Sequence, residues 1–381
     1  MRNVQLQFEN ECYPAWIGVC CLDEIISSLH ELGASSYHVI TDRTVSQLHA
    51  GSLYEQLSAH AAVSLWVVDS GESSKSLRVV EHLASKMVQA GIDRSGVIVA
   101  VGGGVVGNLA GLIAALLFRG IRFVHVPTTL IAAADSVASL KQAVNVSLGK
   151  NLLGCFHTPT ATLIDLNFLQ TLPAAQIRSG MYEIIKNALT VATETIPLLE
   201  HILNRGANYS NAEFMAVVEA GLLAKQKLMK ADKCERKEAL VFEYGHTVGH
   251  AIELAAQGRI PHGEAVGLGM IVAAEVSLRL GRLSEADRSV HHQLLELNGL
   301  AVMLPAGVTV AAVMALLRTD NKRGYICTRP DQVVMILLDS IGVPAGPIGK
   351  PLILVDSSLI QSCIEDCLTG VRNIFVEERH Q

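Results

Sequence analysis

Histidines and acidic residues gather in the second half of the chain, with a spacing that could bind a divalent metal ion. His246 and His250 are four residues apart in EYGHTVGHAIE, and His262 follows in HGEA. Upstream, Glu183 and Lys186 in GMYEIIKNAL are three apart and would share one face of a helix. Imidazole and carboxylate groups are common ligands of zinc and similar ions, so the pattern indicates a metal site. Spacing alone favours His246 and His250 as ligands, whereas the alternative is a pair that only packs or caps a helix.

A run of glycines at residues 102–107 has the pattern of a turn that could hold phosphate groups. The run GGGVVG satisfies G-x-G-x-x-G, follows the apolar run at 96–101 and precedes a helix-compatible stretch. Glycine lets the backbone approach a pyrophosphate and directs the amides of a helix start towards it. The alternative is an ordinary tight turn between a strand and a helix. In the usual dinucleotide-binding fold, an acidic residue at the end of the next strand binds the ribose, but here that strand ends with HVPTT (125–129). Asp42 and Glu72, which follow two other predicted strands, are therefore the candidates for this contact.

Two lysines lie in a segment, residues 135–154, that is otherwise small and apolar. The polar side chains of this segment include Asp135, Lys141, Asn145, Lys150 and Asn151. Ammonium groups among apolar neighbours need an anion, and a phosphate or diphosphate suits them. The alternative is a pair of solvated lysines on a surface loop.

Hydrophobic periodicity predicts two kinds of structure around these residues. Short β-rich runs alternate with amphipathic stretches in the first part; the runs are SYHVITD (36–42), SLWVVD (64–69), GVIVAV (96–101) and RFVHVP (122–127). Strands that alternate with helices form a parallel sheet covered on both faces. Long amphipathic stretches dominate afterwards. The sequence therefore predicts a Rossmann-like α/β domain, residues 1–168, followed by a mainly α-helical domain, residues 169–381, with the change near TLPAAQ (171–176).

Composition limits the classes of partner. The 381 residues carry a formal net charge of -6 with no block of lysine or arginine, which argues against nucleic acid and anionic membranes as partners. The first residues lack the apolar run of a signal peptide, and scattered cysteines without a CxxC pair fit a reducing compartment, so we expect a cytoplasmic protein. Cys363 and Cys367 are four apart, a spacing that suits packing on a helix better than metal binding.

The motifs together resemble one family. In order they are GGGVVGN, RGIRFVHVPTT, DSVASLKQAVN, GKN, EIIKNAL, GHTVGHAIE, HGEA and DNKRG, within residues 97–325. This succession resembles the dehydroquinate synthase-like sugar phosphate cyclases. The forms SLKQAVN and FEYGHTVGHAIE resemble those of the 2-deoxy-scyllo-inosose synthase branch. The forms typical of dehydroquinate synthases at these two places are similar to GGKTAVN and NLGHT.

The resemblance implies a role for each matching position. It implies that zinc or cobalt is bound by Glu183, His246 and His262, which moves His250 to the substrate. The positions implied to contact NAD are Asp42, Glu72, Lys75, Gly103, Gly104, Gly107, Thr128, Thr129, Asp135 and Lys150. The positions implied to contact the substrate are Arg119, Lys141, Asn151, Lys186, His250 and Lys322, with Arg119 reaching across a homodimer interface. Asn108 replaces an Asp common in dehydroquinate synthases, which leaves a cofactor contact there open.

The resemblance also implies a reaction. The substrate would be glucose 6-phosphate, a small sugar phosphate, converted to a six-membered carbocycle by transient oxidation at C4, loss of phosphate from C6, re-reduction and aldol closure, as in the biosynthesis of aminoglycoside antibiotics. Lys141 would hold the leaving phosphate, and Glu243 would act as an acid or base or orient a hydroxyl. The alternatives are a 3-dehydroquinate synthase, a metal-dependent polyol dehydrogenase, and a sugar phosphate sensor without catalysis.

Overall fold

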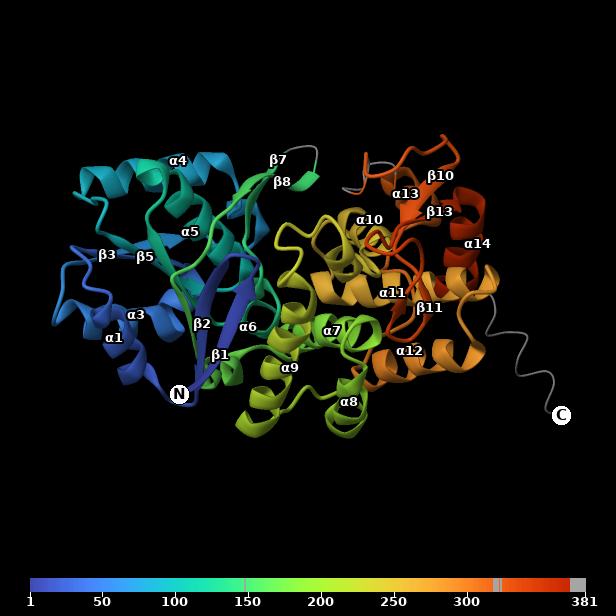
Figure 1. The fold of residues 1–381 in the computed structure, drawn as a ribbon, viewed down its shortest axis with the longest axis horizontal. Helices are drawn as coiled ribbons and strands as arrows, with labels where there is room; N and C mark the ends of the chain where they lie inside the picture. Colours follow the sequence, from blue (N-terminus) through green and yellow to red (C-terminus); the bar gives the residue numbers. More distant parts are fainter. Residues whose placement is uncertain (147–148, 318–321, 323, 371–381) are drawn as a thin grey trace. The chain divides into compact units, whose positions relative to one another are not determined.

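The computed structural model describes residues 1–146, 149–317, 322 and 324–370. It divides into two compact units, both drawn in Figure 1. The first unit comprises Met1–Pro173 and Ser210–Cys234, and the second comprises Ala174–Tyr209 and Glu235–Gln381. The chain therefore leaves the first unit at Pro173, returns to it for one helix, and then leaves again.

A seven-stranded sheet forms the centre of the first unit. Its strand order is β1-β2-β9-β6-β5-β3-β4, with β1 and β2 antiparallel and the other neighbours parallel. The strands are β1 (Arg2–Phe8), β2 (Glu11–Gly18), β3 (Tyr37–Asp42), β4 (Val63–Val68), β5 (Val97–Gly102), β6 (Arg122–Pro127) and β9 (Ala161–Asp165). The four strands predicted from the sequence are β3 to β6, confirmed to within one residue at each end.

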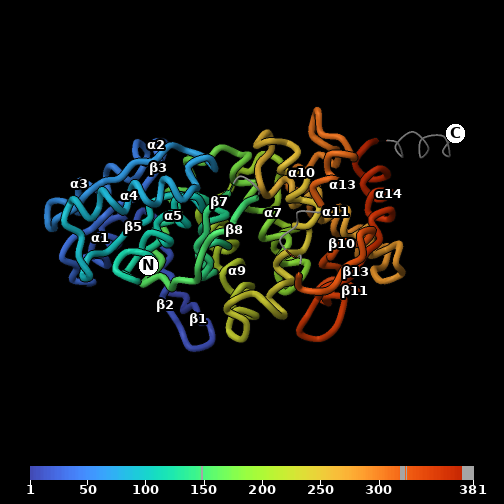
Figure 2. Tube along the Cα trace, turned by 90° about the horizontal axis from the view of Figure 1, so that it is seen from above, coloured from blue at the N-terminus to red at the C-terminus, as the bar shows by residue number. Residues whose placement is uncertain are grey.

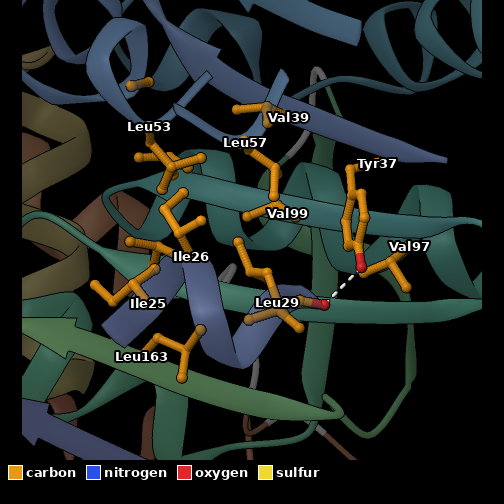
Figure 3. Close-up of a cluster of buried hydrophobic side chains, with 14 of the residues drawn as sticks. Ile25, Ile26, Leu29, Tyr37, Val39, Leu53, Leu57, Val97, Val99 and Leu163 are labelled. Carbon is orange, nitrogen blue, oxygen red and sulfur yellow. Dashed lines mark hydrogen bonds between the residues drawn. The ribbon is translucent and has the colours of Figure 1, made fainter. Parts of the chain in front are cut away.

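Helices pack against both faces of this sheet. Those of the first part are α1 (Leu22–Glu31), α2 (Arg43–Val45), α3 (Gly51–Ser58), α4 (Leu77–Gln89), α5 (Gly104–Leu116) and α6 (Leu130–Ala134). Val99 of β5 belongs to a hydrophobic cluster with α1 and α3, whereas its neighbour Ile98 belongs to a second cluster with α4 and α5. Figure 3 shows the first cluster, in which the Tyr37 hydroxyl donates to the Leu29 carbonyl at 2.5 Å. Because successive side chains of a strand point to opposite faces, both faces of the parallel sheet are buried, as predicted.

One long helix from later in the sequence completes the first unit. Helix α9 (Asn211–Met229) begins with a capping box between Ser210 and Glu213. It lies beside β1, as Figures 1 and 2 show, and the Gln226 side chain donates to the Gln5 carbonyl at 2.6 Å. The sheet edge formed by the N-terminal strand is thus covered by a segment more than two hundred residues away.

The segment with the two lysines forms an antiparallel pair of strands in the first unit. They are β7 (Lys141–Val146) and β8 (Gly149–Phe156), with Lys141 opposite Phe156. Helix α5 packs against β7 at Gly111, where a Cβ atom would lie only 2.2 Å from the Gln142 side-chain oxygen. Lys141, Lys150 and Asn151 therefore lie on a strand pair that is packed against the helix following the glycine turn.

The second unit is mainly helical, which confirms the predicted fold class. Its helices are α7 (Ala174–Thr190), α8 (Ile196–Ile202), α10 (His246–Ala256), α11 (His262–Arg279), α12 (Glu285–Leu297), α13 (Val310–Leu317) and α14 (Ser357–Leu368). Four short strands form two antiparallel pairs, β10 (Gln332–Met335) with β13 (Ile353–Asp356) and β11 (Leu338–Ser340) with β12 (Val343–Pro344). Among the described residues, no helix is long and apolar enough to cross a membrane.

Candidate functional site

The glycine run forms the predicted turn between β5 and α5 in the first unit. Gly103 directly precedes the helix, and a Cβ atom on it would lie 3.0 Å from the Thr129 side chain. A small pocket here is lined by residues that include Gly103, Gly104, Gly107, His125 and Lys141. The turn predicted to bind a cofactor and the lysine predicted to bind a phosphate thus face one hollow within a single unit.

Two threonines follow β6 beside this turn. Thr129 caps α6, since its hydroxyl accepts from the Ala132 amide at 3.3 Å. The Thr128 hydroxyl is buried and has no hydrogen-bond partner among the described residues. A buried hydroxyl without a partner costs free energy, so a ligand that reaches this atom would gain a hydrogen bond already prepared for it.

Hydrogen bonds in the first unit join the segment of Glu72 and Lys75 to Asn151, which lies far from them in the sequence. The Lys75 ammonium donates to the Asn151 side-chain oxygen at 2.5 Å, and the side-chain amide of Asn145 donates to the Glu72 carboxylate at 2.9 Å. The Asn151 backbone amide in turn donates to the Asn145 side-chain oxygen at 2.9 Å. The structure therefore brings two predicted NAD contacts and one predicted substrate contact into one polar network.

The remaining candidates of the first unit are spread around the sheet. Asp42 ends β3, where its carboxylate accepts from the Thr44 amide and the Ser70 hydroxyl, each at 2.9 Å. Asp135 lies 3.1 Å from the ammonium of the buried Lys225 on α9. Arg119 follows the far end of α5, about 20 Å along the helix axis from the glycine turn, and is exposed. Within this unit Arg119 is therefore not brought to the pocket.

Three helices of the second unit approach closely because glycines lie where they touch. A Cβ atom on Gly263 of α11 would lie 2.0 Å from the Ser179 carbonyl oxygen of α7. A Cβ atom on Gly269 would lie 1.9 Å from the Gly245 carbonyl oxygen, just before α10. Any larger residue would separate these backbones. The close packing sets the starts of α10 and α11 beside the middle of α7.

This packing brings a carboxylate and two imidazoles together. Glu183 Oε1 lies 3.6 Å from His246 Nε2 and 3.4 Å from His262 Nε2. Glu183 is 2% exposed, and its other oxygen contacts the Lys186 ammonium. Glu183 Oε1 is buried and accepts no hydrogen bond of good geometry from the described residues. Three ligand atoms thus converge on one point, a donor set that suits zinc or cobalt.

The outer partners of both histidines agree with metal binding. His246 Nδ1 lies 3.1 Å from the Tyr244 carbonyl oxygen, and His262 Nδ1 lies 3.1 Å from Glu253 Oε2. Both partners are acceptors, so each Nδ1 holds a proton, and each Nε2 faces Glu183 and can offer its lone pair to a metal ion once it carries no proton. Metal-binding histidines usually have such a carbonyl or carboxylate behind them. The residues present therefore fit a divalent ion.

His250 belongs to the same cluster. Its ring centre lies 5.0 Å from that of His246 and 5.6 Å from that of His262. The three histidines have ligand atoms within 4.8 Å of one another, so a triad of histidines is an alternative to the triad with Glu183. Both triads share His246 and His262. The geometry leaves open whether Glu183 or His250 is the third ligand, and the assignment to Glu183 stays a prediction.

The members of the cluster differ in the direction in which their surroundings shift their pKa values. Burial acts to raise the pKa of Glu183, but Lys186 and the neighbouring imidazoles outweigh it and hold this pKa well below its usual range. Burial, reinforced by His246, lowers the pKa of His250 to about 3. Burial opposes the positive form of His262, yet the neighbouring carboxylates of Glu183 and Glu253 raise its pKa to about 10 in the absence of a metal ion. The cluster is thus an ionised carboxylate with a neutral imidazole at His250.

Glu243 and Lys322 form a pair in the second unit. Glu243 ends the turn that precedes α10, and its carboxylate lies 3.9 Å from the ammonium of Lys322, which is 1% exposed. Of the motif DNKRG, only Lys322 and Gly324 lie within the described residues. A predicted acid/base residue and a predicted phosphate contact are therefore neighbours.

Sequence reasoning missed several residues that contact the candidates. Glu253 lies seven residues after His246 in GHTVGHAIE, so the helical period carried a signal for it. Lys225, which pairs with Asp135, lies in an amphipathic stretch predicted only to be helical, and no signal in the sequence indicated this contact. Tyr244 supplies a backbone carbonyl, which every residue has, so no residue type could have indicated its role.

Comparison with known proteins places the combination of a glycine turn with a carboxylate and histidine cluster in one class. Family models described as 3-dehydroquinate synthase N-terminal and 3-dehydroquinate synthase C-terminal match residues 65–179 and 180–323. The two models together span residues 65–323, so the chain, with its glycine turn and its carboxylate and histidine cluster, is one of the 3-dehydroquinate synthase-like sugar phosphate cyclases.

The similar proteins narrow the class further. A 2-deoxy-scyllo-inosose synthase of Streptoalloteichus tenebrarius is 44% identical over 367 residues, 96% of this chain and 95% of the relative. A solved structure of 2-deoxy-scyllo-inosose synthase complexed with carbaglucose-6-phosphate, NAD+ and Co2+ is 37% identical, with a TM-score of 0.92 over 96% of this chain and 100% of that chain. The 2-epi-5-epi-valiolone synthase of Streptomyces hygroscopicus, with NAD+ and Zn2+, is 26% identical, with a TM-score of 0.80 over 93% of this chain and 96% of that chain. The chain belongs to the 2-deoxy-scyllo-inosose synthase family.

Proposed function

We propose that the protein converts D-glucose 6-phosphate to 2-deoxy-scyllo-inosose and phosphate. The observation that carries the proposal is the convergence of Glu183 Oε1 with His246 Nε2 and His262 Nε2, in a chain 44% identical to a 2-deoxy-scyllo-inosose synthase. The relative with carbaglucose-6-phosphate, NAD+ and Co2+ supports the same substrate class and the same cofactors. Formally the substrate loses phosphoric acid and its carbons close into a ring, so no net oxidant is consumed.

We assign the cofactor sites to separate units. NAD would lie at the glycine turn of the first unit, with Thr128 and Asp135 among its contacts, and Zn2+ or Co2+ would be held in the second unit by Glu183, His246 and His262. When bound, NAD supplies a hydride acceptor and donor for C4, and the divalent ion polarises an oxygen there. The carbonyl behind His246 and the carboxylate behind His262 would keep both imidazoles oriented.

Lys141 and Asn151 of the first unit are the proposed contacts to the leaving phosphate. Departure of phosphate from C6 develops negative charge on its bridging oxygen, and an ammonium group held nearby stabilises that charge. Lys141 lines the glycine-turn pocket and so lies beside the proposed cofactor turn. The proton lost from C5 would pass to the phosphate or to a residue beside it.

Residues of the second unit are proposed to hold the rest of the substrate. Lys186, His250 and Lys322 would contact its oxygens, and Glu243 would accept a hydrogen bond from a hydroxyl or move a proton there. The ammonium of the buried Lys322 lies 3.9 Å from the Glu243 carboxylate, so these two proposed contacts are neighbours. His250, neutral at any physiological pH, would donate or accept a hydrogen bond without carrying charge.

We also propose that the protein works in the cytoplasm as a homodimer, in the biosynthesis of an aminoglycoside antibiotic. Eight free cysteines support a reducing compartment. The place of Arg119, at the far end of α5 from the glycine turn, supports a role towards a second subunit. Size-exclusion chromatography with light scattering tests the dimer, and a monomer under turnover conditions would exclude it.

The decisive experiment uses the purified full chain with glucose 6-phosphate, NAD and either Co2+ or Zn2+. We expect stoichiometric phosphate release, a product with the mass of 2-deoxy-scyllo-inosose, and no accumulation of NADH. Accumulation of NADH without phosphate release would instead identify a polyol dehydrogenase. Binding of the sugar phosphate without any turnover, with metal present, would identify a sensor.

A further inference from the structure

Asn108 connects the glycine turn to the strand that begins with Lys141. Its side-chain amide nitrogen donates to the Gly104 carbonyl oxygen at 2.9 Å, in the first turn of α5. Its side-chain oxygen accepts from the backbone amide of Ala143 in β7, also at 2.9 Å. The side chain therefore uses one donor and one acceptor at once, which fixes the orientation of the amide.

These bonds hold the edge of β7 that faces away from β8. Strand β7 pairs with β8 along its other edge. On the edge away from β8, the backbone amide of Ala143 donates to the Asn108 side chain, and the backbone amide of Asn145 donates to the Lys75 carbonyl at 2.9 Å. Backbone groups in a part-buried setting need such partners, so these two bonds fix the distance of β7 from its surroundings.

The packing between α5 and β7 leaves little room for the strand to move. Three residues after Asn108, Gly111 accommodates the side chain of Gln142, which is 2% exposed. Lys141 directly precedes Gln142 in the strand and lines the pocket with Gly103. A shift of β7 along α5 would therefore carry Lys141 away from the glycine turn.

We propose that Asn108 is a positioning residue that holds β7, and with it Lys141, against the first turn of α5. Asn108 also lines the pocket, and each end of its amide is bound to a backbone group. An aspartate, common here in dehydroquinate synthases, could still accept from Ala143 but has no proton to donate to Gly104. The asparagine is thus suited to this bridge in a way its isostere is not.

The test compares Asn108→Ala and Asn108→Asp with the wild-type chain and with Leu116→Gln, a control at an exposed position of the same helix. Hydrogen exchange without substrate measures the peptide that contains the Ala143 amide. We expect it to exchange about tenfold faster in Asn108→Ala, with a smaller increase in Asn108→Asp and none in Leu116→Gln. Strands β5 and β6 should be unchanged in every variant.

The kinetic measurement rests on the proposed function. We expect kcat/KM for glucose 6-phosphate to fall about tenfold or more in Asn108→Ala, while NAD affinity, measured separately by calorimetry, stays within about threefold of wild type. An NAD affinity that falls as far as kcat/KM, or an unchanged exchange of the Ala143 peptide, would overturn the proposal. If Asn108→Ala does not fold, Asn108→Asp decides by the same criteria. If the wild-type chain releases no phosphate, the proposed function fails, and the exchange measurement still judges Asn108.

Discussion

Glu253 Oε2 lies 3.1 Å from Nδ1 of His262 and so holds the proton of this imidazole on the side away from Glu183. Glu253 is 7% exposed, which makes the interaction stronger than it would be in water. The carboxylate has no place in the predicted ligand set. It instead determines which nitrogen of a predicted ligand is free to bind a metal ion.

Replacing Glu253 should therefore weaken metal binding without removing a ligand. We expect Glu253→Gln to lower the affinity for Co2+ by about 10-fold to 100-fold, because the amide is a weaker acceptor and can present its NH2 group to Nδ1. Titration of the metal-free protein, followed through the Co2+ absorption spectrum, measures the effect. Glu264→Gln, in the first turn of α11, is the matched control, and an equal loss there would show that any carboxylate near the site matters.

The two overlapping triads make opposite predictions for His250. If Glu183, His246 and His262 bind the ion, each of Glu183→Ala, His246→Ala and His262→Ala should remove bound metal together with activity. His250→Ala should retain one equivalent of metal and impair substrate binding or turnover. Metal content by mass spectrometry and an anomalous-scattering map check this, and loss of metal from His250→Ala would place His250 in the coordination shell.

The strands and the glycine turn could be predicted because their signals are local. Strand β5 is a short, wholly buried run of small and β-branched residues, and Gly103 follows where the backbone must pass close to Thr129. The place of helix α9 could not be predicted. Its partners include Gln5, 221 residues earlier, and amphipathic periodicity shows that a helix has a buried face without showing what covers it.

The candidate site shows the same division between local and distant information. Spacing on one helix selected His246 and His250, because residues four apart share a face. The structure adds Glu183 from the middle of α7 and His262 from the start of α11, since glycines let these helices touch. Only the family resemblance supplied that set from the sequence, because three-dimensional proximity between helices leaves no periodic pattern.

Lys141 should be essential for phosphate release but not for NAD binding. We expect Lys141→Ala to lower turnover of glucose 6-phosphate by about 1,000-fold or more, because it removes the charge proposed to stabilise the leaving group. NAD affinity should change by less than about threefold. Lys150→Ala, in the same strand pair, is the comparison, since Lys150 is assigned to NAD and should mainly weaken that affinity. Unfolding of Lys141→Ala, or equal losses of turnover and NAD affinity, would indicate a structural lysine.

The buried His125 should make the first unit less stable in acid. Burial lowers the pKa of His125 from 6.5 to about 4. The unfolded chain therefore binds a proton as the pH falls below about 6.5, while the folded unit does so only near pH 4, and the stability decreases over this window. The difference corresponds to about 3 kcal/mol for this histidine.

Substitution of His125 tests that pH dependence. We expect His125→Gln to flatten the loss of stability between pH 6.5 and 4.5, without abolishing it, because burial also lowers the pKa of His38 to about 4. Urea unfolding followed by tryptophan fluorescence measures it, since both tryptophans, Trp16 and Trp66, lie in the first unit. A variant with the same pH dependence as the wild type would show that His125 is not responsible.

Substrate choice should follow from the absence of an arginine in the turn that directly precedes α10. Dehydroquinate synthases must bind a substrate carboxylate, and their pattern has an arginine a few residues before GHT, where a guanidinium can clamp that group. Here the corresponding turn, Glu238–Glu243, contains buried Ala239, Leu240, Val241 and Phe242 and no arginine. Glu243 adds a carboxylate, whose oxygen lies 3.9 Å from the Lys322 ammonium. Like charges close together in a buried site cost several kcal/mol, whereas a neutral hydroxyl gains an acceptor.

We therefore expect turnover of glucose 6-phosphate and none of the carboxylated heptulosonate phosphate used by dehydroquinate synthases. Phosphate release from the two sugars, measured side by side with the same metal and NAD, decides between them. Glu243→Gln is the informative variant, because it keeps the size of the side chain and removes its charge. This variant should turn over the carboxylated sugar slightly. Its turnover of glucose 6-phosphate should fall strongly if Glu243 moves a proton, but only weakly if Glu243 merely orients a hydroxyl. Preference of the wild-type protein for the carboxylated sugar would contradict the proposed substrate while leaving the fold and the carboxylate–histidine cluster unchanged.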